Sequence, residues 1–130
     1  MKEMDMIEVI LLVIGATSGA YLRHIASQCR LIVGGLSFDI LLINLIGSFV
    51  LGLFSVLAPH FGLDARHSLL IAVGFCGSLT TMSSFALETS LLIESGEVAA
   101  TVINIVANTS LSIGAVIFGR ALTSILIGRF

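Results

Sequence analysis

Long uncharged stretches of apolar residues dominate the chain, and short segments between them carry most of the charges. Four such stretches contain 14, 24, 21 and 22 residues and lie at 9–22, 40–63, 67–87 and 98–119. A helix needs roughly 20 mostly apolar residues to cross the hydrocarbon core of a bilayer, so the last three qualify directly. The first qualifies when Met6–Leu22 is taken as the span, with Glu8 near the lipid headgroups. The pattern predicts an all-α membrane protein with four transmembrane helices, at about 6–27, 37–58, 67–93 and 98–119.

The composition supports a membrane protein and narrows the range of partners. Of the 130 residues, 57% are hydrophobic and 11% are charged, whereas about 25% of the residues in a soluble domain are charged. The length suits one transmembrane domain over residues 1–130. The net charge of −2 is too small to indicate a charged partner, and no basic groove for nucleic acid is visible in the sequence.

The sequence indicates neither a cleaved signal peptide nor a disulfide. The N-terminal MKEMDMIE has one lysine and three acids, which is a poor n-region for a signal peptide. We therefore expect the first hydrophobic segment to be retained as a span. Cys29 falls in a predicted loop and Cys76 in mid-membrane, so we expect no disulfide between them.

The basic residues give a weak indication of orientation. With four spans, Lys2, Arg66, Arg120 and Arg129 fall on one side of the membrane. The opposite side carries Arg23 and Arg30, together with two acidic residues. Four basic residues on the side of the termini against two on the other side modestly favour cytoplasmic termini. A chain that inserts in either orientation is compatible with the same count.

Polar side chains form a stripe along each of two predicted spans. At about 100° per residue, the members of each stripe share one helical face. They are Asn44, Ser48 and Ser55 in the second span and Asn104, Asn108 and Ser112 in the fourth. An asparagine in the bilayer indicates either an interhelical hydrogen bond or a polar pathway. The strict row in the fourth span favours the pathway, and the absence of an ionisable group in it argues against a proton relay.

Glycines and hydroxyl residues interrupt the third span at Gly74–Phe85, which reads GFCGSLTTMSSF. Glycine weakens a helix, and serine and threonine side chains compete for its backbone hydrogen bonds. We expect a broken helix, whose freed backbone groups must be buried in protein, line a wet cavity or bind an ion. A packing interface rich in serine and threonine is the alternative. Gly15 and Gly19 of the first span, four residues apart, are typical of a close helix contact.

The polar groups inside the spans are nearly all neutral, and only Glu88 approaches the interior as an acid. Amide and hydroxyl hydrogens and the positive edge of a phenylalanine ring suit a small anion, whereas freed carbonyl groups suit a small cation. No nucleophile–base pair, metal-ligand cluster or phosphate loop indicates an enzyme. The sequence chemistry therefore predicts an ion-conducting protein and leaves the sign of the ion open. One chain is too small to shield both stripes, so we expect a homo-oligomer, most simply a two-fold dimer.

Three motifs resemble those of the Fluc/CrcB fluoride channels, which are four-helix proteins that form antiparallel dimers of dual topology. They are GATSGAYLRH, LLINLIGSFVLG and GFCGSLTTMSSFALET, at residues 15–24, 41–52 and 74–89. The resemblance extends from about Gly15 to Gly119. The second and third motifs are specific to the family, whereas the first would be weak evidence of the resemblance on its own.

The resemblance implies a role for particular residues. The backbone carbonyls of Gly77 and Thr80 would hold a structural sodium ion at the two-fold axis of the dimer, the only cofactor implied. Arg23 would shape a vestibule. The fluoride pathway would be lined by Asn44, Met82, Ser83, Ser84, Phe85, Asn108 and Ser112.

The sequence departs from the family pattern at a few positions. Met82 stands where the family has the first of two pore phenylalanines, and a thioether has no positive ring edge. Ser78 replaces a glycine, Asp39–Ile40 replaces Gly-Thr, and Val116 replaces a polar residue of the fourth helix.

The resulting hypothesis is a passive channel in the cell membrane that exports fluoride as an antiparallel homodimer, or paired with a close paralogue. A small multidrug transporter, which relies on a carboxylate in the middle of its first span, is the alternative. Here Glu8 lies at the start of that span, there is no tryptophan, and Tyr21 is the single tyrosine. A membrane scaffold without transport activity is a third possibility.

Overall fold

The computed structural model describes residues 4–29, 32–33 and 36–128. Helix α1 covers Met6–Gln28, α2 covers Phe38–His60 and α6 covers Val98–Ile127. Between α2 and α6 the chain forms α3 (Ala65–Ser68), the π-helix η1 (Leu69–Cys76), α4 (Gly77–Leu79) and α5 (Met82–Glu94). Two strands of two residues each, β1 (Ile32–Val33) and β2 (Leu36–Ser37), pair antiparallel between α1 and α2.

Within the described residues, four helical segments are long and apolar enough to cross a membrane, which confirms the predicted number. They are Met6–Gln28, Phe38–His60, Ala65–Glu94 and Val98–Ile127. Neither the short β1–β2 hairpin nor the π-helical winding of η1 was expected from the sequence. Helix α6 also continues past Arg120 to Ile127, because the residues after Arg120 are again mostly apolar.

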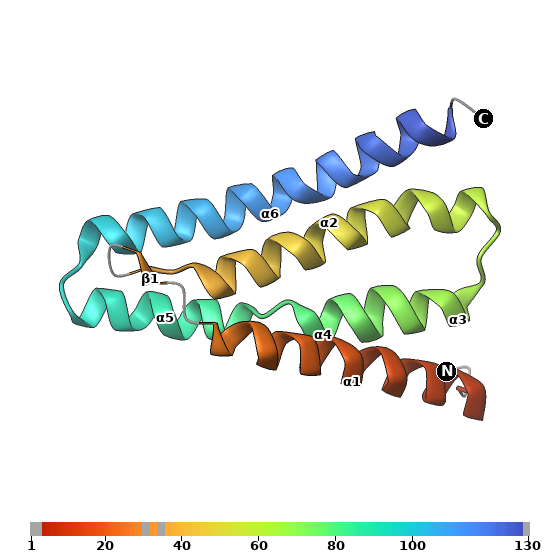
Figure 1. The fold of residues 1–130 in the computed structure, drawn as a ribbon, viewed down its shortest axis with the longest axis horizontal. Coiled ribbons are helices and arrows are strands. Elements are labelled where there is room, and N and C mark those ends of the chain that lie inside the picture. Colours follow the sequence, from red (N-terminus) through yellow and green to blue (C-terminus); the bar gives the residue numbers. More distant parts are fainter. Residues whose placement is uncertain (1–3, 30–31, 34–35, 129–130) are drawn as a thin grey trace.

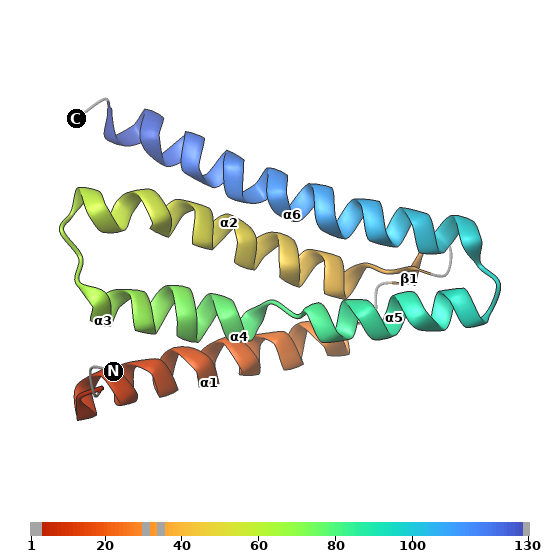
Figure 2. The ribbon, with the colours of Figure 1, turned by 180° about the vertical axis from the view of Figure 1, so that it is seen from behind.

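The spans lie side by side as two helix pairs (Figures 1 and 2). Helix α6 packs mainly against α2, and α1 packs mainly against η1 and α4. The start of α1 and the end of α6 lie at the same end of the molecule, where α2 leads into α3, as expected for an even number of spans. The opposite end carries the β1–β2 hairpin and the connection from α5 to α6.

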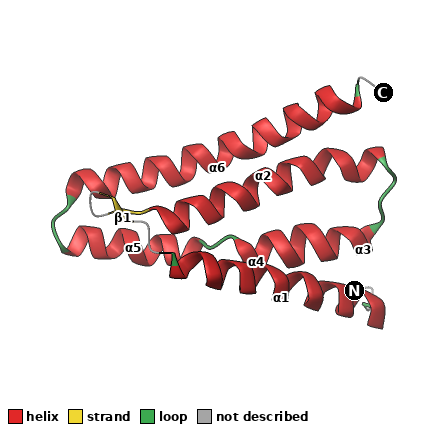
Figure 3. Ribbon diagram, viewed as in Figure 1, coloured by secondary structure: helices red, strands yellow, loops and turns green. Residues whose placement is uncertain are grey.

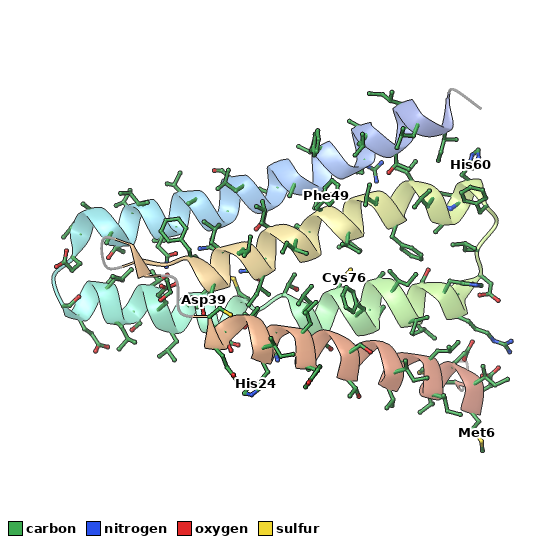
Figure 4. The ribbon with its side chains drawn as sticks, viewed as in Figure 1. Met6, His24, Asp39, Phe49, His60 and Cys76 are labelled. Carbon is green, nitrogen blue, oxygen red and sulfur yellow. The ribbon has the colours of Figure 1, made fainter. Side chains whose placement is uncertain are left out.

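Glycines bring the backbones of each pair into direct contact. A Cβ atom built on Gly15 would lie 2.1 Å from the Leu70 carbonyl oxygen, and one built on Gly19 would lie 2.3 Å from that of Phe75. The predicted close contact of the first span is thereby confirmed. In the other pair, a Cβ atom on Gly119 would lie 2.6 Å from the carbonyl oxygen of Phe49. Phe49, which is labelled in Figure 4, also stacks on Phe118, with ring centroids 5.8 Å apart.

Side chains at the helix ends satisfy backbone groups that the helices leave free. Asp5 and Glu8 form a capping box at the start of α1, with Glu8 N–H donating to Asp5 Oδ1 over 2.7 Å. Asp64 caps α3, and Arg66 in that helix donates to Asp5 over 2.7 Å. This ion pair joins the start of the first span to the start of the third.

Candidate ion pathway

A cavity of about 470 Å³ lies between α2, α6 and the middle of the third span. It brings together residues from three segments that are far apart in the sequence. Seven of the predicted site residues line it: Asn44, Gly77, Thr80, Met82, Phe85, Asn108 and Ser112. Cys76 also lines it, and Figure 4 labels this side chain between α2 and the third span.

The remaining predicted site residues lie elsewhere. Arg23 and Ser84 line a second cavity of about 220 Å³ between α1, α2 and α5, together with His24 and Ser27. Ser83 lines neither of these two cavities, and its hydroxyl lies 3.2 Å from Thr81 Oγ1. Thr81 contributes to both cavities, so it lies at the boundary between them.

The backbone of the third span is extended between α4 and α5. Thr80 has φ −72° and ψ 152°, and Thr81 has φ −146° and ψ 109°. Figure 3 shows this two-residue segment, hereafter the Thr80–Thr81 segment, as a loop between two helices. Helix α5 then begins at Met82, and its first turn is capped by the Thr81 hydroxyl, which accepts from Ser84 N–H over 3.2 Å.

The side chain of Asn44, on α2, forms hydrogen bonds with the backbone of this extended segment. Its Oδ1 accepts from Thr81 N–H over 2.8 Å, and its Nδ2 donates to the Thr81 carbonyl over 3.4 Å. The same Nδ2 donates to Asn108 Oδ1 over 3.3 Å. The Asn44 amide therefore makes one short contact through its oxygen and two long contacts through its nitrogen. Gly47, one turn further along α2, leaves room for Thr80, whose Cγ2 would lie 2.5 Å from a Cβ atom there.

Backbone carbonyls of the third span lose their helical partners at this segment, and those of Gly77 and Thr80 are among them. In a continuous helix, Thr81 N–H would donate to the Gly77 carbonyl, but here it donates to Asn44 Oδ1. Likewise Ser84 N–H donates to Thr81 Oγ1 instead of the Thr80 carbonyl. Gly77 is exposed and Thr80 is half-buried, and both line the cavity. These carbonyl oxygens are accordingly available to a ligand from outside the helix.

The two residues that the family pattern pairs as aromatic pore groups have different surroundings. Phe85 is 9% exposed, whereas Met82 is 73% exposed at the start of α5. Met82 thus lies on the open rim of the cavity and Phe85 in its wall. The rim also includes the exposed residues Gly77, Leu51, Thr109 and Ile113.

The polar residues predicted to share one face of the second span do not all line the cavity. Ser48 lines the cavity with Asn44, but Ser55 lies nearer the other end of α2 and accepts from Arg120 Nη1 over 2.9 Å. Ser55 thus shares the helical face of Asn44 but lies outside the cavity. The reason is the 11-residue separation, which spans three turns of α2.

Thr81 had no role assigned from the sequence, although it is central to the contacts around the extended segment. Its N–H, carbonyl and hydroxyl groups all take part in hydrogen bonds. A threonine directly before a resumed helix is a common N-cap, and this signal was available in the sequence. Thr109 also lines the cavity without having been predicted.

The chain is similar to proteins of one family over most of its length. The model of the CrcB-like protein family, described as Camphor Resistance (CrcB), matches residues 10–120. A protein of Nitrosopumilus maritimus named fluoride-specific ion channel FluC is 47% identical over 95% of this chain and 98% of its own length. Proteins with the same name from Methanococcus vannielii and Rhizobium johnstonii are 36% and 39% identical, over 90% and 89% of this chain and 96% and 95% of their own lengths.

Proposed function

Because the chain belongs to the CrcB-like protein family, we propose that it is a multi-pass membrane channel through which fluoride leaves the cytoplasm passively. The relatives named above are fluoride-specific ion channels, which are not enzymes. One observation carries the proposal for this chain. Asn44, Asn108 and Phe85, which come from three different spans, converge on one cavity that also contains hydroxyl groups.

The geometry of Asn44 suits a transient anion ligand. Its carbonyl oxygen is held by the short bond from Thr81 N–H, whereas both of its N–H contacts are long, at 3.3 and 3.4 Å. The bond to Oδ1 therefore fixes the orientation of the amide, whereas the hydrogen bonds that its N–H groups donate are weak. A passing anion can take these hydrogens without disturbing the bond that orients the side chain. The edge of the Phe85 ring adds a second weakly positive group to the cavity wall.

We propose that the Thr80–Thr81 segment is a break in the third span at membrane depth. Irregular backbone at that depth is tolerated where protein buries it or where it lines a cavity. Both conditions are met here, since Asn44 satisfies the Thr81 backbone and the segment lines the cavity.

The freed carbonyls of Gly77 and Thr80 fit a structural sodium ion. Backbone carbonyl oxygens are ligands that replace the hydration shell of an alkali cation without adding charge. One chain offers two such oxygens, which is fewer than a hydrated ion loses, so the fit improves when a second copy contributes the same pair. When bound, the ion would supply a fixed positive charge that holds the Thr80–Thr81 segments together.

We propose that two copies of the chain pair as an antiparallel homodimer, with a close paralogue as the alternative partner. The cavity is walled on three sides by one chain, and its rim carries exposed apolar residues such as Met82 and Ile113. A second copy placed on this rim would cover these side chains and would bring two Gly77 carbonyls near the two-fold axis. The second cavity, which is lined by Arg23, would then be a positively charged entrance.

A small multidrug transporter is not favoured by the structure of α1. That chemistry needs a carboxylate in the middle of the first span, whereas Glu8 is held in the capping box at the helix start.

Fluoride efflux from proteoliposomes that contain the purified protein tests the proposal directly. We expect fluoride to be released without any coupled ion gradient, and a purified, monodisperse protein that releases none would refute the proposal.

Asn44→Asp should abolish fluoride efflux, because the second carboxylate oxygen would face the Thr81 carbonyl and Asn108 Oδ1, and its charge would repel the anion. Retained efflux in this variant would remove Asn44 from the pathway.

A further inference from the structure

Arg120 is a charged residue within Val98–Ile127, a segment that is long and apolar enough to cross a membrane. Helix α6 continues for seven residues beyond it, and most of them are apolar. Arg120 is exposed, and its Nη1 donates to Ser55 Oγ over 2.9 Å. A hydroxyl group is neutral, and the ion pairs among the described residues involve Arg66 and His67 instead. The positive charge of Arg120 is therefore not offset by any residue that the structure describes.

Arg120 lies on the face of α6 that also forms the cavity rim. Thr109 and Ile113 line this rim, four residues apart, and Arg120 follows Ile113 by seven residues. At about 100° per residue, the three positions fall within about 40° of one another. Phe118 lies on the other side of the helix, where it stacks on Phe49. With a rise of about 1.5 Å per residue, Arg120 is about 10 Å beyond Ile113 along the helix axis.

Helices α2 and α6 run in the same direction and stay in register from the cavity to Arg120 (Figure 1). Asn44 bonds to Asn108 in the cavity, and Ser55 bonds to Arg120 further along, so the partners are 64 and 65 positions apart. No charged residue lies between these two pairs on either helix. Arg120 is thus the first charge beyond the cavity on this pair of helices, toward the end of α6.

The surroundings of Arg120 give its charge little stabilisation unless water reaches it. The exposed side chains of Ile117 and Ile125 on the same helix are apolar. The bond to Ser55, five residues before the end of α2, holds the guanidinium beside the helix pair, so it is not extended toward the lipid headgroups. Ionisable residues within a span generally face the protein interior or a water-filled space. The shared face with the cavity rim favours a water-filled space that leads to the cavity.

We propose that Arg120 lines a second positively charged entrance to the ion pathway, where its charge attracts fluoride toward the cavity. This inference rests on the proposed channel function. Arg23 lines the second cavity near the end of α1, and α1 begins where α6 ends, so the two arginines lie toward opposite ends of the molecule. Each end would then carry one positive charge. Charges that line an entrance raise the local concentration of a counter-ion and its rate of entry.

The charge of Arg120 acts on the capture of the ion and not on its passage through the cavity. Arg120 does not line the cavity, and about 10 Å separates it from Ile113 at the rim. Salt screens charges over about 30 Å at 0.01 M ionic strength and over about 3 Å at 1 M. Attraction over this distance is therefore present at low ionic strength and is lost at high ionic strength, whereas a structural role would not depend on salt in this way.

The test is the initial rate of fluoride efflux from proteoliposomes at a fixed low fluoride concentration. The ionic strength is set with potassium gluconate to about 0.01 M and to about 1 M. We expect R120Q to lower the rate about threefold at the low ionic strength and to match the unmodified protein at the high one. Arg120→Lys and Ser55→Ala both keep the charge, and both should conduct like the unmodified protein. Arg120→Leu replaces R120Q if the glutamine variant is not monodisperse.

The matched control is Arg66→Gln, which removes the same charge from an arginine at the same end of the molecule. Arg66 lies on α3, away from the cavity rim, and is paired with Asp5. The rate in this variant should be unchanged at both ionic strengths. The control therefore separates the position of the charge from the net charge of the protein.

The inference is overturned if R120Q conducts like the unmodified protein at about 0.01 M ionic strength, a result that would assign the guanidinium to lipid headgroups. It is also overturned if R120Q slows efflux equally at both ionic strengths, or if R66Q has the same effect as R120Q. These outcomes leave the proposed function intact, because the unmodified protein conducts in each of them. If the unmodified protein releases no fluoride, the proposed function fails and this inference fails with it.

Discussion

Between α1 and η1, helix backbones touch through glycines, whereas α2 meets the Thr80–Thr81 segment through an amide side chain. The first contact has no side chain between the helices at Gly15 and Gly19, so nothing there can turn or exchange partners. The second contact depends on Asn44, which has two long hydrogen bonds and one short one. Close backbone packing holds each helix pair together, and the polar contact between the pairs borders the cavity.

Gly15→Ala is the strongest test of the close backbone contact between α1 and η1. The added Cβ would lie 2.1 Å from the Leu70 carbonyl oxygen, a distance that requires the helices to separate. We expect a loss of more than about 3 kcal/mol in the free energy of unfolding, measured by thermal unfolding in detergent. The matched control is Gly114→Ala in α6, since no atom of the described residues lies within 4 Å of a Cβ atom built there. Alanine at that position should stabilise the helix by up to about 1 kcal/mol. Equal effects of the two changes would contradict the difference between these glycines.

Substitutions at Phe85 and Met82 compare the cavity wall with its rim. Phe85→Ala removes a ring that is 9% exposed and should cost about 3–5 kcal/mol of stability. Met82→Phe changes a side chain that is 73% exposed and should alter stability by less than about 0.5 kcal/mol. Because it adds a positive ring edge to the cavity rim, the same change should raise fluoride flux into or out of proteoliposomes. Lower flux with unchanged stability would show that the rim does not need an aromatic group.

Asn44→Ala tests whether the polar contact also supports the fold. Thr81 N–H would lose its acceptor and be left unsatisfied, which should cost about 1–3 kcal/mol. Efflux of fluoride should be lost at the same time. The control is Ser55→Ala, which lies on the same helix but outside the cavity and should leave efflux unchanged. A fully stable Asn44→Ala protein would show that water in the cavity satisfies Thr81 N–H equally well.

The smallest expected effect concerns the acidic caps outside the spans. The Glu8 backbone N–H, followed by Arg66, lowers the pKa of Asp5 below its ordinary value of 3.8. Hydrogen bonding to His67 likewise lowers the pKa of Asp64 below 3.8. Because both pKa values are depressed in the folded state, the stability from these groups is complete above about pH 4 and is lost as the pH falls through the folded values. Thermal unfolding between about pH 7 and pH 3 should show this loss in the unmodified protein and a smaller loss in Asp5→Asn.

Much of the architecture could be predicted from local patterns in the chain. The four spans follow from uncharged runs that match the thickness of a bilayer, and the contact at Gly15 and Gly19 follows from their four-residue spacing. The stripe of Asn104 and Asn108 follows from helical periodicity, and their burial at 5% exposure agrees with it. Local spacing could not reveal that Asn44 bonds to Thr81, because these residues are 37 positions apart and meet only when α2 packs beside the third span.

Helical periodicity also could not distinguish Ser48 from Ser55, because a face shared along one helix meets different neighbours at each turn. By itself, the sequence determined which segments cross the membrane and which side chains are polar within them, since hydrophobic length and helical repeat are properties of the chain alone. Only the tertiary structure decided which polar groups meet, which carbonyls lose their partners and which way the amides point. Hydrogen bonds require atoms within about 3 Å with donor and acceptor correctly oriented, and that proximity arises when separate helices pack together.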